Sequence, residues 1–176
     1  MRQKGVNYLM KPCVVKQYIT EALFRLMKEK DYRTIHISEL VQTAGVCRAS
    51  FYRNYLTMED IVDEYYKAAF DDIYSKYPME EHNIRYVVKQ IFCEIKARKR
   101  EFELLNRQGL LGRMDKYIYE GTLSQINKLN VLNNRYQPHF FAGASFALIK
   151  AWIAYGFEES EEEMTQIFFR SLQGYL

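Results

Sequence analysis

The sequence predicts an all-α protein: an N-terminal three-helix helix-turn-helix domain, followed by a larger C-terminal helical bundle. Proline and glycine are scarce, at 3 and 8 of 176 residues, which favours long helices over sheets. Apolar side chains recur along most of the chain at the i, i+3, i+4 spacing that gives a helix one buried face. We expect two domains, at 1–57 and 58–176, because the first three predicted helices end just before Met58.

The first predicted helix runs from Pro12 to about Lys30. Proline suits a first helical turn, and the inward positions hold Val15, Ile19, Ala22, Leu23 and Leu26. Residues 1–11 have no helical period but carry three cations, Arg2, Lys4 and Lys11. This segment is either a flexible basic arm that follows DNA phosphates or enters the minor groove, or an ordinary frayed terminus.

Two short helices follow, over about 37–44 and 48–55, and Gly45 separates them. Glycine enters left-handed backbone without a Cβ clash, so the first of these helices can stop and reverse there. One face of the pair is apolar and holds Leu40, Val41, Ala44, Val46, Phe51 and Tyr55. The second helix offers Arg48, Ala49, Ser50, Tyr52, Arg53 and Asn54 on its remaining faces. A short helix with this exposed set suits the major groove of double-stranded DNA.

Charge is distributed unevenly between the two predicted domains. Residues 1–57 hold ten lysines and arginines against four acidic residues, and residues 58–176 hold fifteen against eighteen. The first domain is therefore basic and the second mildly acidic. A basic N-terminal module is the electrostatic pattern expected of a DNA-binding domain.

Helix signals continue through the second domain. A helix is expected from about Met58 to Tyr77, with Thr57 as its N-cap and acidic residues in its first turn. Further helices are predicted over about 82–100, in a short piece around Phe102, from the glycines 109 and 112 to about Leu132, and over 139–157 and 161–175. Ser160 with Glu163 begins the last of these as a capping box.

The segment 139–157 is apolar nearly all round, with small residues alternating with bulky ones. A helix of this kind is covered by its own core and by a second subunit. We therefore expect a homodimer in which the partner covers part of this helix.

The run A-G-V-C-R-A-S-F-Y-R-N-Y-L-T-M-E-D-I, from Ala44 to Ile61, closely resembles the TetR-type (TetR/AcrR) transcriptional regulators. Their pattern reads roughly A-G-V-S-x-G/A-x-L/F-Y-x-H/Y-F-x-S/N-K-E-x-L. The resemblance covers about the first 60 residues. It implies a DNA-binding repressor that is released by a small-molecule ligand and that forms a homodimer through its last two helices. The alternative is a TetR-like coactivator that responds to a protein partner.

The resemblance and the side-chain chemistry together assign the DNA contacts. Arg48 is expected to donate two bonds to guanine, Ala49 to touch a thymine methyl, and Ser50 to bond to either base type. Tyr52 matches the family's phosphate-binding tyrosine, and Arg53 is a second phosphate candidate.

Three positions depart from the family pattern. His36 stands where the family usually has a threonine that caps the second helix and contacts a phosphate; a histidine can still donate to phosphate. Asn54 replaces a common histidine or tyrosine and remains a possible phosphate donor. Met58 replaces the usual lysine, so one phosphate contact is missing and weaker DNA binding is a possible result.

The identity of the ligand cannot be read from the sequence. The second domain is rich in aromatic residues that could line an apolar ligand pocket; the candidates are Phe92, Phe102, Tyr117, Phe146, Trp152 and Tyr155. The competing interpretation of each is an ordinary core aromatic. The sequence has no metalloprotease, hydrolase, P-loop or dinucleotide motif, so we expect no enzymatic activity and no cofactor.

The cysteines Cys13, Cys47 and Cys93 are far apart and form no CxxC pair. They indicate a reducing cytosol, with neither a disulfide framework nor a metal site. Cys47 lies beside the second short helix, where it is either a redox sensor or a small residue at the helix cap. With no apolar run of about 18 residues and no signal peptide, we expect a cytoplasmic protein without a membrane contact.

Overall fold

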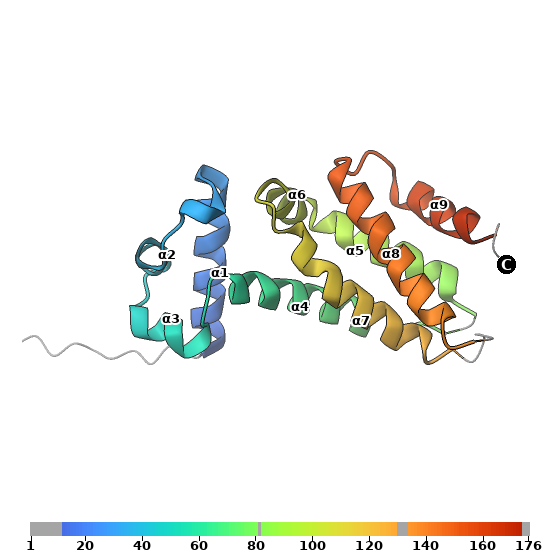
Figure 1. The fold of residues 1–176 in the computed structure, drawn as a ribbon, viewed down its shortest axis with the longest axis horizontal. Coiled ribbons are helices and arrows are strands. Elements are labelled where there is room, and N and C mark those ends of the chain that lie inside the picture. The colour runs from blue at the N-terminus through green and yellow to red at the C-terminus, as the bar shows by residue number, and fades with distance from the viewer. Residues whose placement is uncertain (1–11, 81, 130–133, 174–176) are drawn as a thin grey trace, which may run out of the picture. The chain divides into compact units, whose positions relative to one another are not determined.

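A computed structural model describes residues 12–80, 82–129 and 134–173 (Figure 1); the predicted arm over 1–11 lies outside them. Within these ranges the chain is helical and contains no β-strand. The α-helices are α1 Pro12–Glu29, α2 Ile37–Ala44, α3 Arg48–Asn54, α4 Glu59–Lys76, α5 Ile84–Ala97, α6 Lys99–Arg107, α7 Asp115–Ile126, α8 Gln137–Ala154 and α9 Glu161–Gln173. Two 3-10 helices, η1 Tyr32–Thr34 and η2 Leu111–Met114, lie between them. The all-α prediction is confirmed.

The chain forms two compact units that divide between Val62 and Asp63. The helix α4 crosses this division, because it begins at Glu59 and ends at Lys76. Unit 1 contains α1, α2, α3 and the first turn of α4, and unit 2 contains the remainder.

Unit 1 is built around α1, which packs against both α2 and α3. Apolar residues spaced along α1 are buried together with apolar residues of α2 and α3 and form the core of this unit. Among the described residues of unit 1, those with no exposed surface are Ile19, Leu23, Leu40, Phe51, Ile61 and Val62. The linker between α1 and α2 contains η1 with a buried tyrosine, Tyr32.

Unit 2 is a helical bundle in which α7 pairs with α8 and α5 pairs with α9 (Figure 1). The helix α4 meets α7 through Tyr74, whose hydroxyl hydrogen-bonds to Thr122 Oγ1 at 2.9 Å. The bundle has an aromatic core, in which Phe102 packs against both Tyr66 and Phe70. A second aromatic group joins Trp152 to Phe92 and Phe157, with ring centroids 5.5 and 4.8 Å apart.

The junction between α8 and α9 is fixed at both sides. Gly156 N–H bonds to Ile153 O at 3.0 Å and Phe157 N–H to Trp152 O at 2.9 Å, which is a Schellman C-cap with its usual apolar contact. At the start of α9, Ser160 Oγ accepts from Glu163 N, while Ser160 N donates to Glu163 Oε2 at 2.8 Å. The predicted capping box is therefore present.

Predicted boundaries in unit 2 are wrong at three helices, and one of these helices, α8, also ends at Ala154 and not at Phe157. The helix expected over 82–100 ends at Ala97, and α6 begins at Lys99. Arg98 stands at this break and bonds to the Glu94 carbonyl and to Asp72, a tertiary contact that outweighs local helix propensity. The helix expected to reach Leu132 ends at Ile126. The helix α8 begins at Gln137, not His139, because Pro138 fits the first turn.

No helix among the described residues combines the length and the apolar character that a membrane crossing requires.

Candidate nucleic-acid interface

The turn between α2 and α3 depends on Gly45, whose φ is +66°. Gly45 N–H bonds to Gln42 O at 3.1 Å and Val46 N–H bonds to Val41 O at 3.0 Å. This is again a Schellman motif, and its central residue is left-handed. A Cβ at Gly45 would meet no neighbouring atom within 4 Å. The backbone conformation, not crowding, therefore calls for glycine here.

The inner face of α3 is anchored by two aromatic residues. Phe51 has no exposed surface and Tyr55 is 4% exposed, and their ring centroids lie 6.0 Å apart. Tyr55 is the C-cap of α3, which ends at Asn54, one residue earlier than predicted. Lys16 on α1 lies over the Tyr55 ring at 5.6 Å. Because these two side chains are buried, the opposite side of α3 is the side exposed to solvent.

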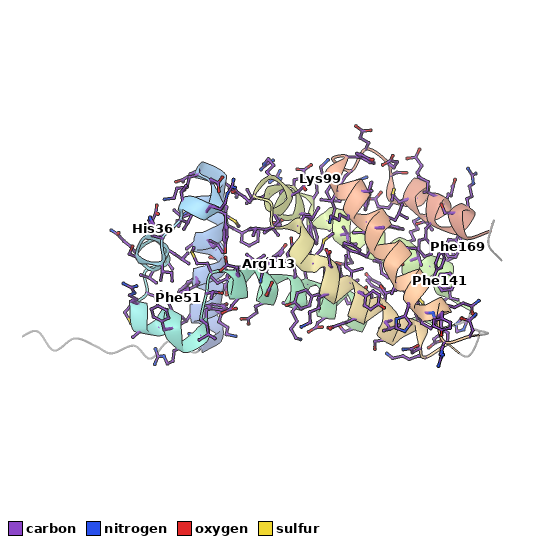
Figure 2. The ribbon with its side chains drawn as sticks, in the orientation of Figure 1. His36, Phe51, Lys99, Arg113, Phe141 and Phe169 are labelled. Atoms are coloured by element: carbon purple, nitrogen blue, oxygen red, sulfur yellow. The ribbon has the colours of Figure 1, made fainter. Side chains whose placement is uncertain are left out.

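The outer face of α3 holds the residues predicted to contact DNA. Arg48, Ala49, Tyr52 and Arg53 are exposed, and Ser50 is half-buried. They come from one short helix, so the structure gathers them on a single surface. In Figure 2, Phe51 marks the buried side of α3 and His36 the start of α2.

The polar side chains of α3 are paired with one another. Arg48 Nη2 lies 3.4 Å from Tyr52 Oη, and its guanidinium lies 5.7 Å from the centre of the Tyr52 ring. Arg53 Nη2 donates to Ser50 Oγ at 3.0 Å. These i, i+4 and i, i+3 pairs follow helical geometry. They hold both guanidinium groups along the exposed face.

Asn54 is less available than the sequence suggested. Its Nδ2 donates to the Ser50 carbonyl at 2.7 Å, and the side chain is half-buried. The amide nitrogen has a second hydrogen, so one donor remains for a phosphate. The backbone contact itself could not be read from the residue type.

The N-cap positions of α2 and α3 are His36 and Cys47, and neither makes a side-chain capping bond. His36 is exposed and so remains available to an outside partner. The pKa of Cys47 is lowered, first by its side-chain hydrogen bond with Ser50 and then by the backbone N–H groups of Ser50 and Ala49. Partial positive charge at a helix start stabilises a thiolate.

The start of α4 is capped by Thr57 and Asp60. Asp60 Oδ2 accepts from the N–H groups of Leu56 and Thr57, both at 2.8 Å, and Asp60 N–H donates to Thr57 Oγ1 at 3.3 Å. This reciprocal arrangement is a capping box. Met58 lies inside it and is half-buried. The turn after α3 is therefore well held, without the usual lysine.

Two further contacts support this surface and were missed from the sequence. Arg25 on α1 donates to the Thr43 carbonyl in the last turn of α2 at 2.8 Å. Asp31 begins η1, where Oδ1 accepts from Arg33 N at 2.8 Å and Oδ2 accepts from Arg33 Nη2 at 2.7 Å. Asp31 carries a recognisable cap signal, whereas Arg25 acts across 18 residues and leaves no local pattern.

The predicted ligand residues do not form one group in unit 2. Phe92 and Trp152 pack together, while Phe102 belongs to the aromatic core with Tyr66 and Phe70. Tyr117 and Phe146 are half-buried, and Tyr155 is 68% exposed. The first three are nearly or fully buried, as core residues are.

Among the described residues, no three histidine, cysteine or acidic side chains are placed so that they could hold a metal ion.

Solved structures share this fold over nearly the whole chain. A crystal structure of Lin0861 from Listeria innocua matches with a TM-score of 0.74 and 14% identity, covering 98% of this chain and 97% of that one. The dihydroxyacetone kinase operon activator DhaS matches with a TM-score of 0.63 and 14% identity, covering 93% and 96%. The TetR family repressor AlkX from Dietzia sp. matches with a TM-score of 0.58 and 13% identity, covering 90% and 95%.

The likeness lies in structure and not in sequence. No protein-family model matches the chain, and no curated protein does. The helix order, the helix-turn-helix at α2 and α3 and these structural matches together show that the chain has the fold of the TetR-type regulators.

Proposed function

We propose that the chain is a sequence-specific, double-stranded-DNA-binding transcriptional regulator that works as a homodimeric repressor and is released by a small-molecule ligand. The observation that carries this proposal is the outer face of α3. Two arginines, a tyrosine and a serine stand exposed or half-exposed on a helix whose opposite face is anchored by Phe51 and Tyr55. Such a helix, preceded by a Schellman turn and a packed partner helix, suits the major groove.

Electrostatics support the same role for unit 1. Residues 1–57 carry a net charge of +6, with ten cationic against four acidic residues. Positive charge attracts the phosphate backbone whatever its sequence, and base contacts then select the site. In this account Arg48, Ala49 and Ser50 face bases, while His36, Tyr52, Arg53 and Asn54 face phosphates.

A dimer through α8 and α9 accounts for the surface of these helices. Phe140 on α8, Tyr155 just after it and Ile167 on α9 are 54%, 68% and 37% exposed in the single chain. Burying large apolar side chains of this kind against a second copy is favourable. Two-fold symmetry would place two copies of α3 on one duplex, so the operator is expected to be pseudo-palindromic.

Release by a ligand would follow from unequal affinity for two arrangements of the dimer. The helix α4 is the physical link, because it is one continuous helix across the division between the units. The aromatic residues of unit 2 would supply the ligand contacts, and the half-buried Tyr117 and Phe146 are the first to test. No enzymatic activity and a cytoplasmic location belong to the same proposal.

An activator is the second candidate. The structural match to DhaS, named as an operon activator, favours it. In this version the DNA-binding surface is unchanged, and unit 2 responds to a protein partner. A reporter gene placed behind the selected operator distinguishes the two, because deletion of the regulator raises transcription for a repressor and lowers it for an activator.

Selection from a pool of randomised duplexes tests the proposal itself. The full chain is expected to enrich a pseudo-palindrome with half-sites about one helical turn apart. Arg107→Ala serves as the charge-matched control for the variants of α3, since Arg107 is an exposed cation on α6. Enrichment of no sequence would reject the proposal.

A further inference from the structure

Ser50 is held by two neighbours on the DNA-facing side of α3. Arg53 Nη2 lies 3.0 Å from Ser50 Oγ, and Cys47 Sγ lies 3.2 Å from the same oxygen. Cys47 is the N-cap of the helix, and Ser50 and Arg53 follow at steps of three residues. The three side chains therefore form one hydrogen-bonded row along the helix.

The hydrogen in each of these bonds can be assigned from the chemistry of the groups. A guanidinium has only donors, so Ser50 Oγ accepts from Arg53. A hydroxyl is a stronger donor than a thiol, and sulfur can accept, so the Ser50 hydrogen is directed to Cys47 Sγ. The lowered pKa of Cys47 has this bond as its largest cause and agrees with the assignment.

With this assignment, the Ser50 hydroxyl can only accept a further hydrogen bond and cannot donate one. Its only hydrogen is engaged by Cys47, one lone pair is engaged by Arg53, and one lone pair remains. In the major groove the adenine N6 and cytosine N4 amino groups are donors, whereas guanine O6 and N7 and thymine O4 are acceptors. An acceptor-only Ser50 therefore discriminates between these two classes of base.

We propose that Cys47 is a specificity-determining residue that acts by positioning Ser50: it takes the Ser50 hydrogen, so that Ser50 selects a base with an amino group, adenine or cytosine, at one position of each half-site. This inference rests on the proposed DNA-binding function. It narrows the earlier expectation that Ser50 bonds to either base type. Arg53 has further N–H groups, so its bond to Ser50 is compatible with a phosphate contact.

The experiment uses the full chain and the duplex that the wild type selects from the randomised pool. Each base pair of the half-site is replaced in turn by the other three, and affinities are measured by fluorescence anisotropy at fixed salt. The variants are Ser50→Ala, Cys47→Ala, Cys47→Gly and Cys47→Ser, with Cys93→Ala as the control. Cys93 is a half-buried thiol on α5 in unit 2. Glycine is tolerated at an N-cap, so Cys47→Gly removes the sulfur without relying on alanine there.

Ser50→Ala is expected to abolish a preference of about threefold to tenfold at one base pair, the value of a single hydrogen bond. Cys47→Ala and Cys47→Gly free the Ser50 hydrogen, so the same base pair should tolerate guanine or thymine to within about twofold of adenine or cytosine. Cys47→Ser should keep the wild-type preference, because its hydroxyl oxygen can accept the hydrogen. Cys93→Ala should change nothing.

Two results would overturn the inference about Cys47 and would leave the proposed DNA-binding function standing. If both Cys47 variants kept the wild-type preference while Ser50→Ala lost it, Ser50 would read the base without Cys47. If Ser50→Ala kept every preference, Ser50 would not face a base. A wild-type chain that distinguishes no duplex would instead reject the proposed function, and the inference with it.

Discussion

Tyr74 on α4 lies directly against Gly121 on α7. A Cβ atom built on Gly121 would come within 2.0 Å of Tyr74 Cε2 and 2.5 Å of Cδ2. The ring is held in place, because Tyr74 Oη bonds to Thr122 Oγ1 at 2.9 Å and donates to the Ile118 carbonyl at 3.3 Å. The helices α4 and α7 can therefore approach this closely only because residue 121 is a glycine and has no Cβ.

Gly121→Ala is expected to destabilise unit 2 by about 1–3 kcal/mol, the usual cost of overpacking a core. The opposing gain in helix propensity is about 1 kcal/mol at most. Urea unfolding followed by circular dichroism measures the difference. Gly112→Ala in η2 is the control, since a Cβ there meets no atom within 4 Å, and it should be close to neutral. Equal midpoints for the two variants would contradict the packing argument.

Arg48→Ala is expected to weaken binding to the selected operator by about 1–3 kcal/mol and to loosen the preference at one base pair, the value of a bidentate guanine contact. Arg107→Ala, which removes the same charge from α6, should have little effect. Anisotropy titrations against the operator and its single-pair variants provide the measurement. If Arg48→Ala left affinity and preference unchanged, the recognition face would be assigned wrongly.

Tyr52→Phe separates the two contacts of this tyrosine. The ring that lies against the Arg48 guanidinium is kept, while the hydroxyl that we propose contacts a phosphate is lost. All duplex sequences should therefore be bound more weakly by a similar factor, with base preferences retained. A changed base preference would show instead that the hydroxyl acts mainly through Arg48.

The lowered pKa of Asp31 allows a prediction of how the helix-turn-helix unit responds to acid. Bonds from the Arg33 side chain and backbone lower the pKa of Asp31 from 3.8 to about 2. Because the folded-state pKa lies below the unfolded value, the stabilisation is present above about pH 4 and is lost as the pH falls toward 2. Carboxyl NMR titration of the full chain should place the Asp31 midpoint near 2. A midpoint near 3.8 would show that the cap does not form in solution.

Trp152 connects α8 to α9 and is 1% exposed. Its indole N–H donates to the Glu159 carbonyl at 3.2 Å, and its ring packs against Phe92 and Phe157. Trp152→Ala should cost about 3–5 kcal/mol of unfolding free energy. Glu158→Ala, six residues away and exposed, should stay within about 0.5 kcal/mol. Similar losses for both, measured by denaturant unfolding, would contradict the burial of Trp152.

Much of the helix-turn-helix unit could be predicted because its signals are local. Gly45 marks the turn between α2 and α3, Thr57 marks the start of α4, and Ser160 marks the start of α9 far along the chain. Each acts within a few residues through backbone geometry or a cap. On both sides of these points the predicted helix bounds lie within about three residues of the observed ones, and the largest difference is at the end of α8.

The remaining features depend on contacts between distant residues. Arg98 interrupts the helix predicted over 82–100 by bonding to Asp72, which is 26 residues earlier. Gly121 carries no sign in the sequence that Tyr74 will lie against it. On α3 the spacing identified the exposed residues, but it did not reveal that Ser50 is bonded to both Cys47 and Arg53. Side-chain pairing of this kind requires rotamers that a helical pattern does not specify.

The most direct test of DNA recognition is fluorescence anisotropy of the purified chain with DNA from upstream of its own coding sequence. A random duplex of equal length is measured beside it, at about 50 and about 200 mM salt. The account predicts saturable binding about a thousandfold tighter than to random DNA, and weaker at the higher salt. Equal affinity for the two duplexes at both salt concentrations would contradict specific recognition of this DNA by the chain alone.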